Sequence, residues 1–335
     1  MKISHEQIKN ITFGAAYVEQ LNGKTVFHRF TKEQEALYKT VSEKFYKKTF
    51  ANSCITLEFE TNSSSLFIKA ELTPRSSRYF YSHDVYVDNE LCGSIKGEFD
   101  VTQENIEKKT VEGQFSLGST NKEKNVRIHL PWSCSSDIIE LSIDDGASII
   151  PIQKSRKIIF FGDSITHGYD AEYTSNSYAS RIMLSLNAEA RNKGIGGEIF
   201  RADLARIKDD EFEPDIITVA YGTNDWFLDV SKNDFCNESE EFFEALINNY
   251  PNAKIFAIAP IWRTDYQDEH PIGKFSDVRD HFVKLAKKHP RINVIDGFDF
   301  VPHDCELFSD KSLHPNDEGF SYYAKSLEGE IKKYL

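Results

Sequence analysis

Residues 157–166 read Lys-Ile-Ile-Phe-Phe-Gly-Asp-Ser-Ile-Thr, an apolar run that ends in a glycine, an aspartate and a serine. The apolar part predicts a buried strand, and four similar runs follow it, separated by amphipathic helical patterns. Strands are expected at residues 157–161, 188–192, 215–221, 253–259 and 292–296, and helices at 177–186, 201–208, 238–249, 277–288 and 317–334. Apolar strands that alternate with helices indicate a parallel sheet covered on both faces, so an α/β domain is expected here.

The residues that follow these strands are the candidates for a functional site, because an open parallel sheet binds its ligands at the carboxyl ends of the strands. The stretches concerned are GDSIT at 162–166, NKGIGGE at 192–198, GTND at 222–225, PIWR at 260–263 and, before the last helix, DKSLHP at 310–315. Together they supply the groups that serine-based acyl transfer needs.

Ser164 is the candidate nucleophile. Its hydroxyl needs an adjacent base, and His314 is the candidate, held by Pro315, which is expected at the first position of the last helix. A carboxylate or a backbone carbonyl would fix the tautomer of the imidazole. The backbone N–H groups of Ser164 and Gly197 and the side-chain amide of Asn224 are the candidate donors to an oxyanion.

Trp226 and Trp262 follow the third and fourth strands, and each is expected either to form a flat platform for a sugar or to belong to the pocket wall or the core. His167 is expected either to touch substrate or to lie on a helix surface. The triplet His303-Asp304-Cys305 contains metal-binding residue types, but adjacent positions rarely share one metal, so no metal site is expected.

The four blocks GDSIT, NKGIGGE, GTND and DKSLHP resemble, in order and spacing, those of the SGNH (GDSL-type) hydrolase superfamily, over about residues 156–335. The resemblance implies a flavodoxin-like three-layer α/β/α fold and ester hydrolysis through an acyl-serine, with no metal or cofactor. By motif, Ser164 matches the nucleophile, His314 the base, and Gly197 and Asn224 the oxyanion donors. Gly197 stands five places after the asparagine of its block, and Gly196 is the alternative.

One departure from the family pattern concerns the acidic residue. The family's acid usually stands three residues before the histidine, where this chain has Lys311, whereas Asp310 stands four before. We favour Asp310 as the partner of His314, carried there by the extra loop residue. The alternative is a Ser–His dyad whose imidazole is oriented by a backbone carbonyl near Lys311 or Ser312.

The first 150 residues have a different pattern, with short alternating runs at residues 55–59, 65–69, 84–88, 125–130 and 138–143 between turn residues. These predict a β-sandwich, such as a jelly roll, with residues 32–48 as a short helix or an irregular loop. The expected domains are therefore a sandwich at 1–150 and a hydrolase domain at 151–335, with the division within 146–156.

A sandwich before an SGNH domain is similar to the arrangement in carbohydrate esterase family two, whose members remove acetyl groups from oligosaccharides and polysaccharides. The expected function is therefore that of a serine esterase acting on O-acyl, above all O-acetyl, esters of carbohydrates. One alternative is a lipid or acyl-thioester hydrolase on the same scaffold, and another is a non-catalytic sugar-binding protein. The GxSxG elbow of α/β-hydrolases is absent, because Thr166 stands in place of its second glycine.

The composition restricts the partners. With 40 basic and 53 acidic side chains the formal charge is −13, which disfavours nucleic acid and anionic membranes and is compatible with a small-molecule or oligosaccharide ester. No run approaches 18 apolar residues and the N-terminus lacks a signal-like core, so a cytoplasmic location is expected. The five cysteines are expected to be free, buried thiols. The oligomeric state is left open.

Overall fold

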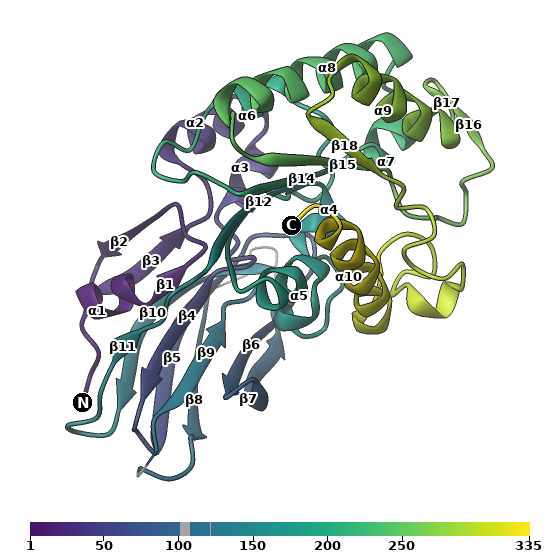
Figure 1. Ribbon diagram of the computed structural model, residues 1–335. Helices are drawn as coiled ribbons and strands as arrows, with labels where there is room; N and C mark the ends of the chain where they lie inside the picture. Colours follow the sequence, from purple (N-terminus) through teal and green to yellow (C-terminus); the bar gives the residue numbers. More distant parts are fainter. Residues whose placement is uncertain (101–107, 121) are drawn as a thin grey trace.

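The computed structural model describes residues 1–100, 108–120 and 122–335. Figure 1 shows two parts, a β-sandwich built from the first half of the chain and an α/β layer structure built from the second half. The two parts are packed against each other, and the link between them runs from β11 (Ile150–Pro151), which pairs with the sandwich, to β12 (Arg156–Gly162), which lies in the parallel sheet.

The sandwich consists of two antiparallel sheets. The first has the order β1-β4-β9-β6-β7 with β11 beside β4, and the second has the order β2-β3-β10-β5-β8. The strands are β1 (Thr12–Phe13), β2 (Tyr17–Leu21), β3 (Lys24–His28), β4 (Thr56–Thr61), β5 (Ser65–Pro74), β6 (Phe80–Val87), β7 (Glu90–Glu98), β8 (Lys109–Ser116), β9 (Lys124–His129) and β10 (Cys134–Ile143). Alternate residues of β5, from Leu66 to Leu72, are buried in the core between the sheets, as their period of two requires.

The α/β part contains a parallel sheet of order β13-β12-β14-β15-β18, with β13 (Ala188–Asn192), β14 (Ile216–Ala220), β15 (Lys254–Ile258) and β18 (Ile292–Ile295). One face packs against α5 (Tyr178–Ser185) and α10 (Asp317–Lys332). The other packs against α6 (Ala202–Arg206), α8 (Lys232–Asn249) and α9 (Ser276–Lys288). Residues 158 and 160 of β12 face the first core and 159 and 161 the second, so the strand is buried on both sides. The expected flavodoxin-like three-layer fold is confirmed.

The expected strands and helices of the second half agree with the observed elements to within one or two residues, apart from α8, which begins six residues earlier. The five strands expected in the first half are all present. The sequence did not indicate the short helices α1 (His5–Asn10), α4 (Ser164–His167) and α7 (Thr223–Phe227), nor the hairpin of β16 (Glu269–His270) and β17 (Gly273–Lys274). The cysteines are free as expected, but only Cys54 and Cys134 are buried. Cys236 is half-buried, and Cys92 and Cys305 are exposed.

Residues 32–48 form two helices, α2 (Lys32–Val41) and α3 (Glu43–Thr49), which pack against the α/β part rather than in the sandwich. The buried side chain of Arg29 fixes this segment. Its Nε donates to the carbonyl of Ala51 (2.6 Å), Nη2 to that of Lys48 (3.0 Å), and Nη1 to those of Asn192 (2.7 Å) and Gly194 (3.0 Å). One guanidinium therefore ties the N-terminal half to the loop after β13.

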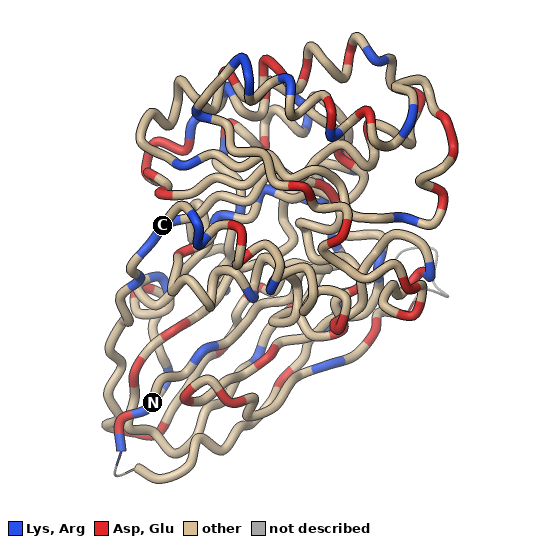
Figure 2. The backbone as a smooth tube through the Cα atoms, turned by 45° about the vertical axis from the view of Figure 1, so that its right-hand side comes forward, with Lys and Arg blue, Asp and Glu red and all other residues tan. Residues whose placement is uncertain are grey.

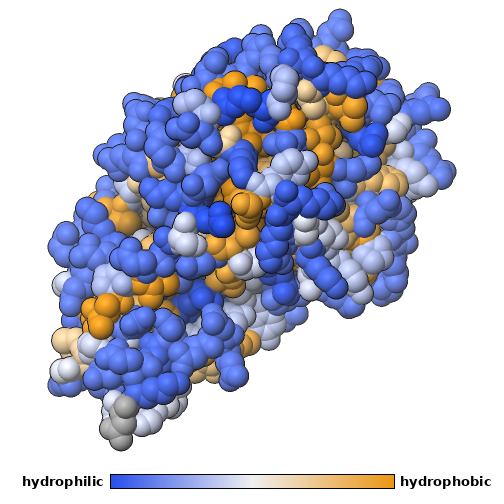
Figure 3. Space-filling view, in the orientation of Figure 1, coloured by the Kyte–Doolittle hydropathy of each residue, from blue (hydrophilic) through white to orange (hydrophobic). Residues whose placement is uncertain are grey.

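Acidic and basic side chains are interspersed along the whole backbone (Figure 2). The face seen in Figure 3 is hydrophilic over most of its area, with smaller hydrophobic patches between. Among the described residues, no helix has both the length and the apolar character needed to cross a bilayer.

Candidate active site

Ser164 lies at the carboxyl end of β12, where the strand turns sharply into α4. Gly162 permits this turn, because a Cβ at that position would lie 2.0 Å from Oγ1 of Thr166. Asp163 caps α4 by accepting the N–H of Ile165 at 2.9 Å. The turn places Ser164 at the first helical position, with its side chain 4% exposed.

His314 is held by the loop that precedes α10. A β-bridge joins Phe308 to Pro315, and the N–H of Ser309 donates to the carbonyl of His314 at 2.8 Å. This loop places Nε2 of His314 2.8 Å from Oγ of Ser164, within hydrogen-bond reach. Pro315 does not begin the helix as expected. The cap of α10 is Asn316, whose side chain accepts two backbone N–H groups, so Pro315 stands just outside the helix in the bridge.

Asp310 contacts the imidazole on the side opposite Ser164, with its Oδ2 2.6 Å from Nδ1 of His314. Its Oδ1 accepts the N–H groups of Ser312 (3.0 Å), Leu313 (2.8 Å) and His314 (3.1 Å). Burial raises the pKa of this carboxyl, but the hydrogen bonds from His314 and the backbone outweigh burial, so the pKa lies well below its ordinary value. Asp310 is therefore an anion that accepts a hydrogen bond from Nδ1–H of His314 and so stabilises that tautomer of the imidazole.

A second carboxylate lies near the same nitrogen. Oδ2 of Asp170 is 3.9 Å from Nδ1 of His314, and Arg78 donates to both Asp170 oxygens, at 2.5 and 3.0 Å. Arg78 comes from the loop between β5 and β6, and its guanidinium also lies over the ring of Tyr169, which stacks on His314 at 5.9 Å. The sandwich thus contributes a cation to the surroundings of the candidate base, which sequence reasoning did not identify.

The loop after β13 supplies the candidate oxyanion donors. Gly197 has φ +86°, and a Cβ there would meet only Phe45, at 3.8 Å, whereas one on Gly196 would lie 2.4 Å from Tyr169. The backbone N–H groups of Ser164 and Gly197 donate to no group among the described residues. The open space beside Gly197 favours it over Gly196 as the donor.

Asn224 lies beside the same loop, in the first turn of α7. Its Nδ2 donates one hydrogen to the carbonyl of Glu198 at 2.9 Å, which leaves the second hydrogen for a ligand. The loop itself is fixed by Asn192, whose Nδ2 donates to the carbonyl of Thr166 at 2.7 Å while its Oδ1 accepts the N–H of Gly194 at 2.8 Å. A fixed loop is what a preorganised oxyanion site requires.

Helix α3 borders this loop. Nζ of Lys48 donates to the carbonyl of Gly196 at 2.5 Å, and Phe45 faces Gly197. The lack of strand alternation between residues 32 and 48 set this segment apart in the sequence, but no pattern connected it with a loop about 150 positions later.

A sugar platform was one of the expected roles of the two tryptophans, but both side chains are buried. Trp226 is 0% exposed, its Nε1 donates to the carbonyl of Gly273 at 3.0 Å, and its ring packs against Phe275, so it belongs to the core and offers no face to a sugar. Trp262 is 8% exposed, with the ring of His303 stacked on it at 5.2 Å and that of Phe308 packed against it at 5.4 Å. Trp226 is therefore a core residue and cannot act as a sugar platform. Trp262 can offer a sugar only a small part of its ring.

Three further titratable side chains near the site are buried, namely Asp163, His167 and Asp225. His167 is wholly buried, with Nε2 2.9 Å from the carbonyl of Trp132, so it neither touches substrate nor lies on the surface, and burial keeps its pKa well below the ordinary value. Burial raises the pKa of Asp163 to about 6 and that of Asp225 to about 7. Asp225 accepts the N–H groups of Phe200 and Gly222, so it braces the loop beside Asn224.

Comparison with known proteins places the second half of the chain in a family. Residues 160–321 match the model of the GDSL-like Lipase/Acylhydrolase family. No curated protein matches the sequence. The C-terminal part is thus an SGNH/GDSL-type acyl-hydrolase domain.

Solved structures share the two-part architecture. A salicylyl-acyltransferase from a tetracycline biosynthetic pathway has a TM-score of 0.82 at 20% identity, over 96% of this chain and 94% of its own. A family two carbohydrate esterase from Clostridium thermocellum, in complex with cellohexaose, has 0.65 at 17% identity, over 85% and 94%. One from Cellvibrio japonicus has 0.66 at 16% identity, over 99% and 96%. At such identities the likeness concerns the fold alone.

Proposed function

Because residues 160–321 carry a GDSL-type acyl-hydrolase domain, we propose that this protein is a serine esterase that removes O-acyl, above all O-acetyl, groups from carbohydrates. The observation that carries the proposal is the continuous chain of contacts from Ser164 Oγ through His314 Nε2 and Nδ1 to Asp310, at 2.8 and 2.6 Å. A nucleophile, a base and an orienting acid in contact form the arrangement that activates a serine.

In the proposed reaction, Nε2 of His314 takes the proton of Ser164 while Oγ attacks the ester carbonyl. The N–H groups of Ser164 and Gly197 and the amide of Asn224 stabilise the oxyanion that forms. The imidazolium then protonates the leaving sugar oxygen, and the acyl-serine remains. A water molecule, deprotonated by His314, releases the acid, while Asp310 stabilises the imidazolium in both steps.

The surroundings of His314 support a carbohydrate as the leaving group. A cavity of about 480 Å³ reaches Asp170 and lies between the edge of the sandwich and the α/β part. It is lined by Phe80, Tyr81, Lys96, Gly97, Glu98, Asp170, Glu172 and Ser309. Charged and hydroxyl groups beside the partly exposed ring of Phe80 suit a sugar, which presents both hydroxyls and apolar C–H faces. The solved family two esterase with cellohexaose supports the same substrate class.

The test is acetate release from acetylated xylo- and manno-oligosaccharides, together with a series of aryl esters of increasing acyl length. We expect acetate release from the sugars and falling rates with longer acyl chains. Turnover of long acyl esters, without acetate release from any sugar, would instead establish the lipid or thioester hydrolase. Failure of a fluorophosphonate to label Ser164 would favour a non-catalytic sugar-binding protein.

Acyl transfer to an alcohol is a second candidate. It is favoured by the fold shared with the salicylyl-acyltransferase over 96% of this chain. Adding alcohol acceptors to the aryl acetate assay separates the two functions. A transferase converts most of the ester into the new ester, whereas a hydrolase releases acetate in the presence of the acceptor.

A further inference from the structure

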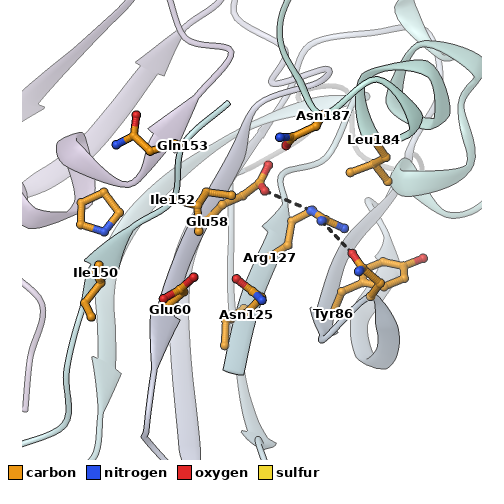
Figure 4. Close-up of a pocket in the computed structure, with 13 residues that line it drawn as sticks. Glu58, Glu60, Tyr86, Asn125, Arg127, Ile150, Ile152, Gln153, Leu184 and Asn187 are labelled. Carbon is orange, nitrogen blue, oxygen red and sulfur yellow. Dashed lines mark hydrogen bonds and ion pairs between the residues drawn. The ribbon is translucent and has the colours of Figure 1, made fainter. Parts of the chain in front are cut away.

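A cavity of about 550 Å³ lies where the outer face of the first sandwich sheet meets the α/β part, and it is separate from the site around Ser164. Figure 4 shows Glu58 and Glu60 of β4 beside Asn125 and Arg127 of β9, with Tyr86 of β6 at one side. The link residues 150–153 close the cavity on the side of β4, and Leu184 and Asn187 close it from the α/β part. Its volume is in the usual range for small-molecule sites.

The floor of this cavity is a fixed polar network. Glu58, 1% exposed, accepts hydrogen bonds from Nζ of Lys154 (2.8 Å), Nε of Arg127 (3.2 Å) and Oγ1 of Thr56 (2.7 Å). Nη2 of Arg127 donates to Oδ1 of Asn89 at 3.0 Å. With Nε and Nη2 both engaged, the guanidinium is held in one orientation, and its Nη1 has no hydrogen-bond partner among the described residues.

The walls carry further polar groups with unused hydrogen-bonding capacity. The side-chain amides of Asn125, Gln153 and Asn187 and the carboxylate of Glu60 form no hydrogen bond or ion pair within the described part of the chain. Three amides offer both donors and acceptors, and they stand around a surface that also includes the apolar side chains of Leu184 and Ile152.

The charges of the cavity indicate the class of its ligand. The carboxylates of Glu58 and Glu60 balance the cations of Arg127 and Lys154, so a ligand of either sign gains little from the site as a whole. Amides and a fixed guanidinium are suited to pairs of neighbouring hydroxyls, and the apolar part of the wall is suited to C–H groups. We propose that this cavity is a second, non-catalytic binding site for a neutral carbohydrate.

The position of the cavity makes it independent of the catalytic site. Asn187 directly precedes β13, so the cavity lies at the amino ends of the parallel strands, whereas Ser164 follows their carboxyl ends. The seven residues of β12 separate the two edges by about 20 Å. The site would thus hold a sugar chain remote from the ester that reacts.

The test is calorimetric titration of the full chain with cellohexaose, xylohexaose and mannohexaose, none of which carries an ester. We expect at least one to bind, and the double variant Asn125→Ala, Gln153→Ala to weaken binding at this site by at least about tenfold. The matched control is Gln114→Ala, an exposed amide on β8 of the other sheet. Both variants should retain wild-type hydrolysis of an aryl acetate, which also shows that they are folded.

Two results would overturn the proposal: no binding of any of the three sugars to the wild type, or equal affinity and stoichiometry in the wild type and the double variant. The proposed esterase function can fail separately. If binding depends on Asn125 and Gln153 while no acetylated sugar is hydrolysed, the second site stands and the enzymatic assignment does not.

Discussion

Asp310 and His314 stand four residues apart, and Oδ2 of Asp310 lies 2.6 Å from Nδ1 of His314. Lys311, at φ +60°, turns the chain between them. Oδ1 of Asp310 accepts three backbone N–H groups from the residues that follow, so the acid stabilises the turn that carries the base. The additional loop residue therefore leaves the acid in contact with the imidazole, which supports a triad rather than a dyad.

The first prediction concerns Asp310→Asn. The amide would keep an oxygen for the backbone N–H groups but present an NH2 group to Nδ1, which favours the wrong imidazole tautomer. We expect kcat for an aryl acetate to fall by about 10³ to 10⁴, with a small change in KM.

Asp170→Asn is the matched comparison, because this carboxylate is 3.9 Å from Nδ1 and is already paired with Arg78. Its loss should be less than about tenfold. If Asp170→Asn were the more damaging change, Asp170 rather than Asp310 would be the acid of the triad.

Ser164→Ala and His314→Ala test the nucleophile and the base. Each should lower kcat for an aryl acetate by at least about a thousandfold, and the double variant should lose little more, because residues that act as one unit are not additive. Circular dichroism melts establish that the variants are folded. Activity within tenfold of the wild type in either variant would disprove the proposed mechanism.

Asn224→Ala tests the oxyanion site. Removal of the Nδ2 donor should lower kcat by about 10² to 10³ and leave KM nearly unchanged, because the donor acts on charge that develops in the transition state. The carbonyl of Glu198 loses its partner as well, so Asn224→Asp, which keeps the shape but not the donor, is a useful second variant. A change in KM alone would mean that Asn224 binds substrate instead.

Arg29→Met tests the connection between the N-terminal segment and the loop after β13. Four carbonyl oxygens would lose their donor in a buried site, and we expect the free energy of unfolding to fall by about 3 to 5 kcal/mol in denaturant titrations. The control is Arg279→Met, an exposed arginine paired with Asp296 on the surface, which should change it by less than about 1 kcal/mol. Equal effects would show that Arg29 has no special role in stability.

Asp163 is one of the groups that contribute to the pH dependence of stability. Burial raises its pKa to about 6 in the folded state, against about 4 in the unfolded chain. Between these values the folded state binds more protons, so the contribution of Asp163 to stability is present below pH 4 and is lost as the pH rises through about 6. The loss is roughly 3 kcal/mol.

Asp163→Asn removes this titration and keeps an acceptor for the N–H of Ile165. The free energy of unfolding, measured near pH 4 and near pH 8, should therefore decrease less with pH in the variant than in the wild type. Parallel pH profiles for the two proteins would contradict the raised pKa.

The pattern of the sequence was sufficient for the α/β part. Strands buried on both faces, such as 157–161, are continuous apolar runs, and the helices between them have a clear period. The ends of these elements could therefore be located to within about two residues, except for the start of α8, which lies six residues earlier than expected. The same pattern placed Ser164, Gly197 and Asn224 after strand ends, which the chain topology brings to one edge of the sheet, and His314 before the last helix. The sequence did not predict the strands β2, β3 and β7. These strands are short or partly exposed, and such strands give a weaker apolar signal.

Only the tertiary structure decided which groups complete the site. The sequence left Asp310 and a backbone carbonyl as alternatives, because the contact depends on the left-handed turn at Lys311. It could not connect Lys48 with Gly196 or Arg78 with Asp170, since these pairs are far apart along the chain and meet only where the two parts pack together. It also could not assign Trp226, because the burial of a side chain depends on neighbours from other segments, here Phe275 and Gly273, rather than on the residue itself.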